Sequence, residues 1–261
     1  MEQLAFDCVL PHRVVQYDCV EAMRSLAGSG CLFDLVIADP PYNIGVDYGD
    51  GKAADRRPDY DSWSREWIEA AAAVVAPHGS LWVISGQEHA AVIDLAIQGA
   101  GLSMRNRITW EETFGVYCHN KFGRTSRPVF YAVKDPSNFT FNADVVRVPS
   151  ARQERYGDKR ADPRGKIMGD VWRINRVCGT FRERVAGVPT QLPVELVSRI
   201  VSCCSRQGDT ILDPFAGSGT TILAAMMAGR VGHGIEKSLE YTRIANERLA
   251  RAAKGLSSRD R

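Results

Sequence analysis

The chain of 261 residues has the length of one α/β domain that carries a modest insertion. Hydrophobic residues make up 44% and charged residues 25%, which is typical of a globular protein. No apolar run reaches the length that a bilayer requires, and the first residues lack the basic and apolar regions of a secretory signal. We therefore expect a cytoplasmic protein that makes no contact with a membrane.

Charge is distributed unevenly along the chain. The formal net charge is +2, but residues 147–187 hold 11 Lys/Arg against 5 Asp/Glu, a local excess of +6 that leaves −4 for the rest. Such asymmetry indicates one face that binds a polyanion. The seven cysteines contain no C-x-x-C pair and the five histidines are scattered, so we expect neither a disulfide framework nor a metal site.

Strands and helices are predicted to alternate along the first half of the chain. The apolar run at residues 33–39 indicates a buried parallel strand that brings Asp39 to the edge of a sheet. The elements expected next are a helix at 63–76 ended by Pro77 and Gly79, a strand at 80–85, a helix at 89–101 and two strands at 107–110 and 129–133.

The second half continues the alternation. Its expected elements are a helix at 193–205, a strand at 209–214, a helix at 220–229, a strand at 231–236 and a helix at 239–253. This order predicts an α/β, Rossmann-like, doubly wound and mostly parallel sheet, with ligands at the carboxyl ends of its strands.

Three stretches do not fit this alternation. Residues 42–61 are polar and rich in Gly and Asp, which indicates a mobile loop. Residues 138–187 lack sustained periodicity and hold the basic cluster, so we expect a functional insertion within a single domain that spans residues 1–261. The tail at 254–261 is expected to be disordered.

The first chemical motif is Asp39-Pro-Pro-Tyr42, directly after a predicted strand. The lone pair of an aromatic amine is delocalised into its ring, so its nucleophilicity rises when acceptors hold its two N–H bonds. Asp39 can supply a carboxylate and Pro40 a carbonyl, and the prolines stiffen the turn that presents them. Tyr42 offers a ring on which an extruded base could stack. The alternative is a rigid loop with a capping Asp and a packed tyrosine.

The second motif is DPFAGSGTT at residues 213–221, between a strand and a helix. Gly217 and Gly219 allow a ligand to approach the backbone near a helix amino terminus. Glu236 ends the next strand, where a carboxylate can accept both hydroxyls of a ribose. A nicotinamide dehydrogenase shares these features, but Ile222 stands where the third glycine of G-x-G-x-x-G belongs.

Together the motifs resemble the β group of amino-methylating DNA methyltransferases, in which D/S-P-P-Y precedes F-x-G-x-G. The segments QYDCVEAMRSL, ITW, VFYAVK, VWRI, PTQLPVEL and GIEKSLEYTRIANERL resemble further parts of that group. One departure is Leu192, which replaces a usual lysine. The resemblance implies S-adenosylmethionine as cofactor, bound by Asp18, Asp39, Thr190, Gln191, Asp213, Phe215, Gly217, Ser218, Gly219, Thr220 and Glu236, with Asp39, Pro40 and Tyr42 as catalytic residues.

The basic segment lies where this group carries its target-recognition region. We expect Arg152, Arg155, Lys159 and Arg160 there, with Lys121 and Arg124 near the strand pair, to contact DNA. The alternative is a solvated charged surface. Trp172 is expected to pack in the core rather than stack on a base.

The resemblance implies transfer of a methyl group from S-adenosylmethionine to N6 of adenine in a specific sequence of double-stranded DNA. The amine attacks directly, without a metal or a covalent enzyme intermediate, on a base flipped from the duplex. Methylation of cytosine N4, a catalytically inactive DNA-binding protein and a nicotinamide enzyme are the alternatives. The sequence leaves open a homodimer and a cognate restriction endonuclease as partners.

Overall fold

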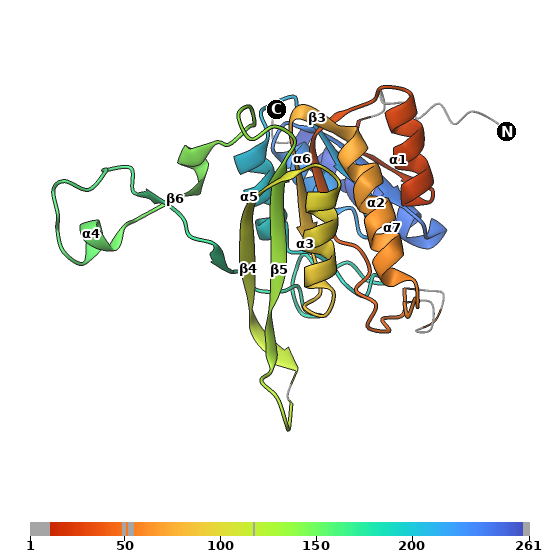
Figure 1. Cartoon of the computed structure of the whole chain (residues 1–261), viewed down its shortest axis with the longest axis horizontal. Helices are drawn as coiled ribbons and strands as arrows, with labels where there is room; N and C mark the ends of the chain where they lie inside the picture. Colours follow the sequence, from red (N-terminus) through yellow and green to blue (C-terminus); the bar gives the residue numbers. More distant parts are fainter. Residues whose placement is uncertain (1–10, 49–50, 52–54, 117, 258–261) are drawn as a thin grey trace.

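The computed structural model describes residues 11–48, 51, 55–116 and 118–257 (Figure 1). The central sheet has the strand order β1-β10-β9-β2-β3-β5-β4-β8. Strands β1, β10, β9, β2 and β3 all run parallel to one another. Strand β5 is antiparallel to both its neighbours, and β8 is parallel to β4. The strands are β1 (Arg13–Gln16), β2 (Phe33–Ala38), β3 (Val75–Ile84), β4 (Ser103–Val116), β5 (Arg124–Val133), β8 (Val171–Arg173), β9 (Thr210–Asp213) and β10 (Val231–Glu236).

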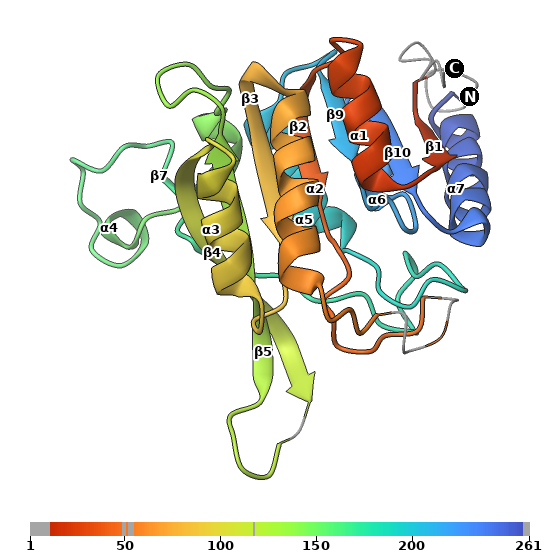
Figure 2. The ribbon, with the colours of Figure 1, turned by 45° about the vertical axis from the view of Figure 1, so that its right-hand side comes forward.

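Helices cover both faces of this sheet (Figures 1 and 2). On one face, α1 packs against α2 and α2 against α3; on the other, α5 packs against α6, and α7 lies beside β1. The helices are α1 (Cys19–Gly28), α2 (Tyr60–Val74), α3 (Ala90–Gly99), α5 (Val194–Cys204), α6 (Thr220–Met227) and α7 (Leu239–Ser257).

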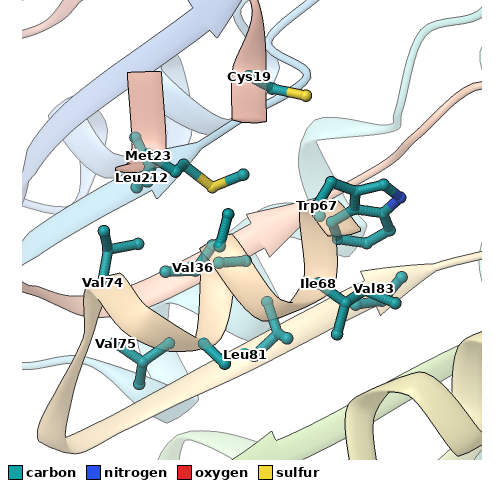
Figure 3. Close-up of a cluster of buried hydrophobic side chains, with 14 of the residues drawn as sticks. Cys19, Met23, Val36, Trp67, Ile68, Val74, Val75, Leu81, Val83 and Leu212 are labelled. Atoms are coloured by element: carbon teal, nitrogen blue, oxygen red, sulfur yellow. The ribbon is translucent and has the colours of Figure 1, made fainter. Parts of the chain in front are cut away.

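Strand β2 shows why its sequence is continuously apolar. Alternate side chains of a strand point to opposite faces, and both faces of this strand are covered. Val36 packs with Trp67 and Ile68 of α2 in one core cluster (Figure 3), whereas Leu35 and Ile37 belong to the cluster on the other face. The Rossmann-like, mostly parallel α/β sheet expected from the sequence is confirmed.

Two strands that lie far apart in the chain are neighbours at the centre of the sheet. Val36 of β2 is paired with Leu212 of β9 in a parallel ladder. The following residues, Asp39 and Asp213, therefore come to the same edge of the sheet. The helices that follow the two strands, α2 and α6, lie on opposite faces, which makes this the point where a doubly wound sheet binds its ligand.

The structure differs from the expected elements in a few places. Strand β1 and helix α1 were not predicted as elements. Pro77 and Gly79 lie inside β3, where a register shift in the β2–β3 pairing accommodates them, so they do not separate the helix from the strand. Helix α7 continues to Ser257; residues 254–257 are therefore helical, and residues 258–261 of the expected disordered tail lie outside the described part.

The expected insertion at 138–187 is only partly separate from the body. At its start, Val146 in the 3₁₀ turn η1 (Ala143–Val146) is buried in the core, and at its end β8 extends the main sheet. Trp172 of β8 stacks on Trp82, so the expected core packing of Trp172 is confirmed. The projecting part contains β6 (Arg147–Val148), α4 (Ala151–Glu154) and β7 (Lys166–Ile167) (Figure 1).

Candidate active site

A cavity opens where the parallel strands β9, β2 and β10 end. Asp213 is the last residue of β9, Glu236 is the last residue of β10, and Asp39 directly follows β2. All three side chains line the cavity. Parallel pairing causes this convergence, because it brings the carboxyl ends of neighbouring strands to one edge.

The glycine-rich turn between β9 and α6 forms one wall of the cavity. Gly217 and Gly219 have φ values of +47° and +75°, a left-handed conformation that favours glycine. The amide of Gly219 donates to the Ala216 carbonyl over 2.7 Å, which closes the turn. Helix α6 begins at Thr220, which lines the cavity, so the positive end of the helix dipole lies at this wall.

Glu236 fastens this turn to the end of β10. Its Oε2 accepts from the amide of Gly217 and its Oε1 from the amide of Ser238, each over 2.8 Å. Burial raises the pKa of Glu236, and these amides oppose that effect. Because each carboxylate oxygen has two lone pairs, Glu236 can still accept hydroxyls of a bound ribose.

Asp18 and Arg248 lie near the glycine-rich turn and the end of β10. Oδ1 of Asp18 accepts from the amides of Val20 and Glu21 at 2.9 Å and 3.3 Å, so Asp18 caps α1 while it lines the cavity. Arg248 of α7 donates to the carbonyl of Ser218 over 3.0 Å. No pattern in the sequence indicated Arg248, because its contact depends on how α7 packs.

The turn after β2 holds Asp39 in a defined position. The hydroxyl of Tyr42 donates to Oδ1 of Asp39 over 2.5 Å. The hydroxyl of Tyr60 donates to the carbonyl of Pro41 over 2.7 Å, which fixes the turn from helix α2. Tyr42 is only 8% exposed, so in this structure its hydroxyl orients Asp39 while little of its ring is open for stacking.

A half-buried arginine that no sequence motif indicated completes this group. Arg127 of β5 donates from Nη1 to the hydroxyl of Tyr42 over 3.0 Å, and its Nε lies 2.9 Å from Oε1 of Glu112 on β4. Its Cζ lies over the ring of Tyr42, 5.0 Å from the centroid. Arg127 is one of several arginines near this point of the chain, so no pattern in the sequence distinguished it.

Burial controls the ionisation of the two aspartates at the sheet edge. Desolvation raises the pKa of Asp39 to about 6, and the charge of Arg127 and the hydrogen bond from Tyr42 oppose this rise. Desolvation likewise raises the pKa of Asp213 to about 7, with the charge of Asp39 adding to the effect. Above pH 7, Asp39 is therefore mostly ionised and can accept the hydrogens of an amine.

Aromatic side chains form the apolar side of the cavity. Phe215 makes edge-to-face contacts with Trp63 and Trp67, at centroid distances of 5.9 Å and 5.2 Å. Phe215 and Trp63 line the cavity, and the guanidinium of Arg57 lies 4.7 Å from the ring of Trp63. The cavity thus combines flat apolar surfaces with carboxylates, as a ligand with an aromatic base and a ribose requires.

The segment between Tyr42 and α2 lacks regular structure but is tied down where it is described. The carboxylate of Asp55 accepts backbone amides from Asn43, Ile44, Gly45 and Val46, at 2.8–3.2 Å. Asp55 is 4% exposed and lines the cavity. The described residues at the start of the expected mobile loop are therefore held in place by one buried carboxylate that lines the cavity.

The structure brings most of the expected cofactor-binding residues to the cavity, with two exceptions. Gln191 does not line it; its amide side chain instead bridges the backbone of Glu183 and Val185, at 2.7 Å and 2.8 Å. Gly219 caps α6 behind the wall. The lining residues among those expected are Asp18, Asp39, Pro40, Tyr42, Thr190, Asp213, Phe215, Gly217, Ser218, Thr220 and Glu236.

The expected DNA contacts fall in two projections. Lys121 and Arg124 lie on the β4–β5 hairpin, which extends beyond the body on the side where β3 and β2 end (Figure 2). Arg124 forms an ion pair with Glu88. The other four residues lie on the projection around α4 (Figure 1); they are Arg152, Arg155, Lys159 and Arg160.

Aspartates within the α4 projection pair with part of its basic charge. Asp158 lies 2.9 Å from Nε of Arg160 and 3.7 Å from Nε of Arg152. Arg155 and Lys159 are exposed and form no ion pair with a residue that the structure describes. These two side chains therefore carry the unpaired charge of the four.

Comparison with known proteins assigns the family. A family model described as DNA methylase matches residues 33–247. The chain belongs to this DNA methylase family. This DNA methylase is 32% identical to the type II methyltransferase M.HpaI of Haemophilus parainfluenzae, over 96% of this chain and 78% of that protein. It is 34% identical to the DNA adenine methyltransferase YhdJ of Escherichia coli K12, over 83% of this chain and 76% of that protein.

Solved structures agree with the fold of this DNA methylase. The M1.HpyAVI–SAM complex has a TM-score of 0.67 at 22% identity and covers 91% of this chain and 98% of its own. The cytosine-N4-specific PvuII DNA methyltransferase has a TM-score of 0.66 at 14% identity, with 93% of each chain covered. The resemblance inferred from the motifs is confirmed, and the family match decides against a nicotinamide enzyme.

S-adenosylmethionine, the methyl donor of this family, fits the cavity of the DNA methylase. The carboxylate of Glu236 can accept hydroxyl groups, the rings of Phe215 and Trp63 offer flat apolar surface, and the amino terminus of α6 favours a negatively charged group. In the described part of the chain, no group of three or more His, Cys, Asp or Glu side chains is arranged to hold a metal ion. None of the described helices is both long and apolar enough to span a membrane.

Proposed function

We propose that this protein methylates N6 of adenine within a specific sequence of double-stranded DNA. The observation that carries the proposal is that Asp39, held by Tyr42 at the end of β2, shares one cavity with Glu236 and the glycine turn. An amine placed at Asp39 is thereby adjacent to the place where the cofactor fits. The relative named as a DNA adenine methyltransferase, YhdJ, supports N6 of adenine over N4 of cytosine.

The chain contributes acceptors rather than a nucleophile. The carboxylate of Asp39 and the carbonyl of Pro40 accept the two N–H bonds of the amine, which localises its lone pair. S-adenosylmethionine supplies an electrophilic methyl group on a sulfonium. A nitrogen–carbon bond forms as the carbon–sulfur bond breaks, with its electron pair going to sulfur, and Asp39 is placed to receive the proton that the amine then loses.

DNA binding is assigned to the two projections. The β4–β5 hairpin extends from the side of the molecule where β2 ends (Figure 2), and Asp39, which a base must leave the duplex to reach, directly follows β2. The projection around α4 presents Arg155 and Lys159 to the phosphate backbone. A homodimer, a cognate restriction endonuclease and a cytoplasmic location stay predictions.

Base-resolution sequencing of DNA from cells that express the protein tests the proposal. We expect N6-methyladenine at one recurring sequence, and none in cells that express Asp39→Ala. In vitro, Asp39→Ala should abolish methyl transfer but change the dissociation constant of S-adenosylmethionine only a few-fold. The glycine turn and Glu236, which are proposed to bind most of the cofactor, are left intact in this variant. N4-methylcytosine at the recurring sequence would replace the adenine assignment, and normal turnover by Asp39→Ala would overturn the catalytic one.

A further inference from the structure

An ion pair between a half-buried arginine and a buried glutamate lies beside the proposed catalytic carboxylate. Arg127 and Glu112 come from the adjacent strands β5 and β4, and their side chains are 25% and 7% exposed. Nε of Arg127 lies 2.9 Å from Oε1 of Glu112. A buried pair of this kind rarely stabilises a fold more than apolar residues of similar size would, so a role beyond stability is the first question to ask.

The other end of the guanidinium reaches the active site. Nη1 of Arg127 donates to the hydroxyl oxygen of Tyr42 over 3.0 Å, and that hydroxyl donates its hydrogen to Asp39 over 2.5 Å. Because Arg127 donates to the oxygen of Tyr42, the hydroxyl hydrogen is directed to Asp39. Glu112, Arg127, Tyr42 and Asp39 thus form one chain of polar contacts from β4 to the cavity.

We propose that Arg127 and Glu112 are positioning residues for methyl transfer: Glu112 anchors Arg127, and Arg127 orients Tyr42 and places a positive charge near the carboxylate of Asp39. The proposal rests on the catalytic role proposed for Asp39. Arg127 does not take part in bond formation; it acts through Tyr42 and through its charge.

Electrostatics favours this role. An acceptor for amine hydrogens must be ionised, yet burial raises the pKa of Asp39. The charge of Arg127 lowers that pKa, whereas the charge of Glu112 raises it. The ionisable groups that face Asp39 come from every element around it: Tyr42 and Tyr48 from the following loop, Tyr60 from α2, Glu112 from β4, Arg127 from β5 and Asp213 from β9. Arg127 is the cation in this set.

The geometry also selects arginine over lysine. The planar guanidinium offers several donors in a fixed fork, so one side chain can contact Glu112 and Tyr42 at the same time. Its face lies over the ring of Tyr42, and its Cζ is 5.4 Å from the ring of Trp110. A lysine would supply the charge but not both contacts in this arrangement.

The test is the pH profile of single-turnover methyl transfer at saturating cofactor and cognate DNA. Arg127→Met combined with Glu112→Gln removes the pair without leaving a buried charge unpaired. We expect the acid limb of the profile, the part in which the rate rises with pH, to move to higher pH by roughly one unit. An opposite charge at this range lowers a carboxyl pKa by about 1–3 units, and the loss of Glu112 offsets part of the loss of Arg127. The rate should therefore fall several-fold near pH 8.5, where only the orientation of Tyr42 is lost, and about five-fold further near pH 6, where Asp39 also becomes protonated.

Arg127→Lys separates charge from orientation. It should leave the acid limb within a few tenths of a unit of the wild type, because the charge remains, but lower the rate several-fold at every pH. Arg107→Met is the matched control: Arg107 is also a strand arginine in an ion pair, with Asp94, but it lies on the surface away from the cavity. Its profile should equal that of the wild type.

Thermal melting and calorimetry of cofactor binding confirm that each variant is folded. If the double variant is folded and its rate and acid limb match those of the wild type, the pair only supports the fold and the proposal is overturned. Asp39→Ala in the same assay keeps the two hypotheses apart. An active Asp39→Ala contradicts the proposed function itself, whereas an inactive one with an unaltered double variant contradicts only the role of Arg127.

Discussion

The hydroxyl of Tyr42 donates a 2.5 Å hydrogen bond to the carboxylate of Asp39, three residues earlier in the chain. The hydroxyl contribution of Tyr42 is separate from the stacking expected of its ring, which is only 8% exposed in this structure. Its ring is the proposed stacking surface for an extruded base, and its hydroxyl positions Asp39 and lowers the pKa of that carboxylate.

Substitution of Tyr42 should separate these two contributions. Near pH 8.5, Tyr42→Phe should retain more activity than Tyr42→Ala, because stacking of a base on an aromatic ring contributes about 1–3 kcal/mol. Near pH 6, Tyr42→Phe should lose more activity than it does near pH 8.5. Without the hydroxyl the pKa of Asp39 rises further, so the carboxylate becomes protonated. Single-turnover rates across this pH range provide the measurement. Equal losses in both variants at pH 8.5 would argue against stacking.

Glu236→Gln should weaken binding of S-adenosylmethionine. A hydrogen bond to a charged acceptor contributes about 1.5–3 kcal/mol, and glutamine has only one oxygen for the amides of Gly217 and Ser238. Calorimetry measures the effect, and DNA affinity should change less. Glu240→Gln, at an exposed position in the first turn of α7, is the control. An unchanged cofactor dissociation constant would limit Glu236 to supporting the end of its strand.

Gly219→Ala should destabilise the protein. The φ of +75° costs an L-residue roughly 1–2 kcal/mol, and the new Cβ would lie 3.2 Å from Cβ of Ala245 on α7. Gly99→Ala is the matched control, since no atom lies within 4 Å of the Cβ it adds at the end of α3. Urea denaturation should show a lower free energy of unfolding for Gly219→Ala alone. Equal stability of the two variants would contradict the argument from backbone conformation.

The projection around α4 should bind DNA through its unpaired charges. Replacing Arg155 and Lys159 with Gln should lower the slope of log affinity against log salt by about one to two, because each phosphate contact contributes about 0.9. Replacing Arg152 and Arg160 should have a smaller effect, because Asp158 offsets their charge. Titrations on cognate and scrambled duplexes at several salt concentrations measure both. If a folded variant with all four of these residues replaced has an unaltered slope, DNA is bound by another part of the protein.

Asp213 should make the apo protein less stable as the pH rises. Burial raises its pKa from 3.8 to about 7, so between these values the folded state retains a proton that the unfolded state has released. The free energy of unfolding should therefore fall as the pH rises through this range. Asp213→Asn should reduce that fall, and Asp39 should account for part of what remains. Urea denaturation at several pH values checks this; an equally steep fall in the variant would mean that Asp213 ionises normally.

The sequence alone determined the fold class and the family. Runs such as residues 33–39 are apolar throughout because a central parallel strand is buried on both faces, and that pattern is visible without coordinates. Asp39 and Glu236 were predictable for a related reason: a polar residue at the end of a buried strand has to lie at the edge of the sheet. Short elements at the start of the chain, β1 and α1, offered weaker patterns and were missed.

Only the tertiary structure decided which side chains act together. Asp39 and Asp213 meet because β2 pairs with β9, a contact across more than 170 residues that no local pattern encodes. Arg127 and Arg124 are equivalent in sequence terms, but strand pairing and burial place one beside Tyr42 and leave the other exposed with Glu88. Desolvation depends on everything packed around a group, so the raised pKa of Asp39 and the charge of Arg127 that opposes this rise became visible only once the chain was folded.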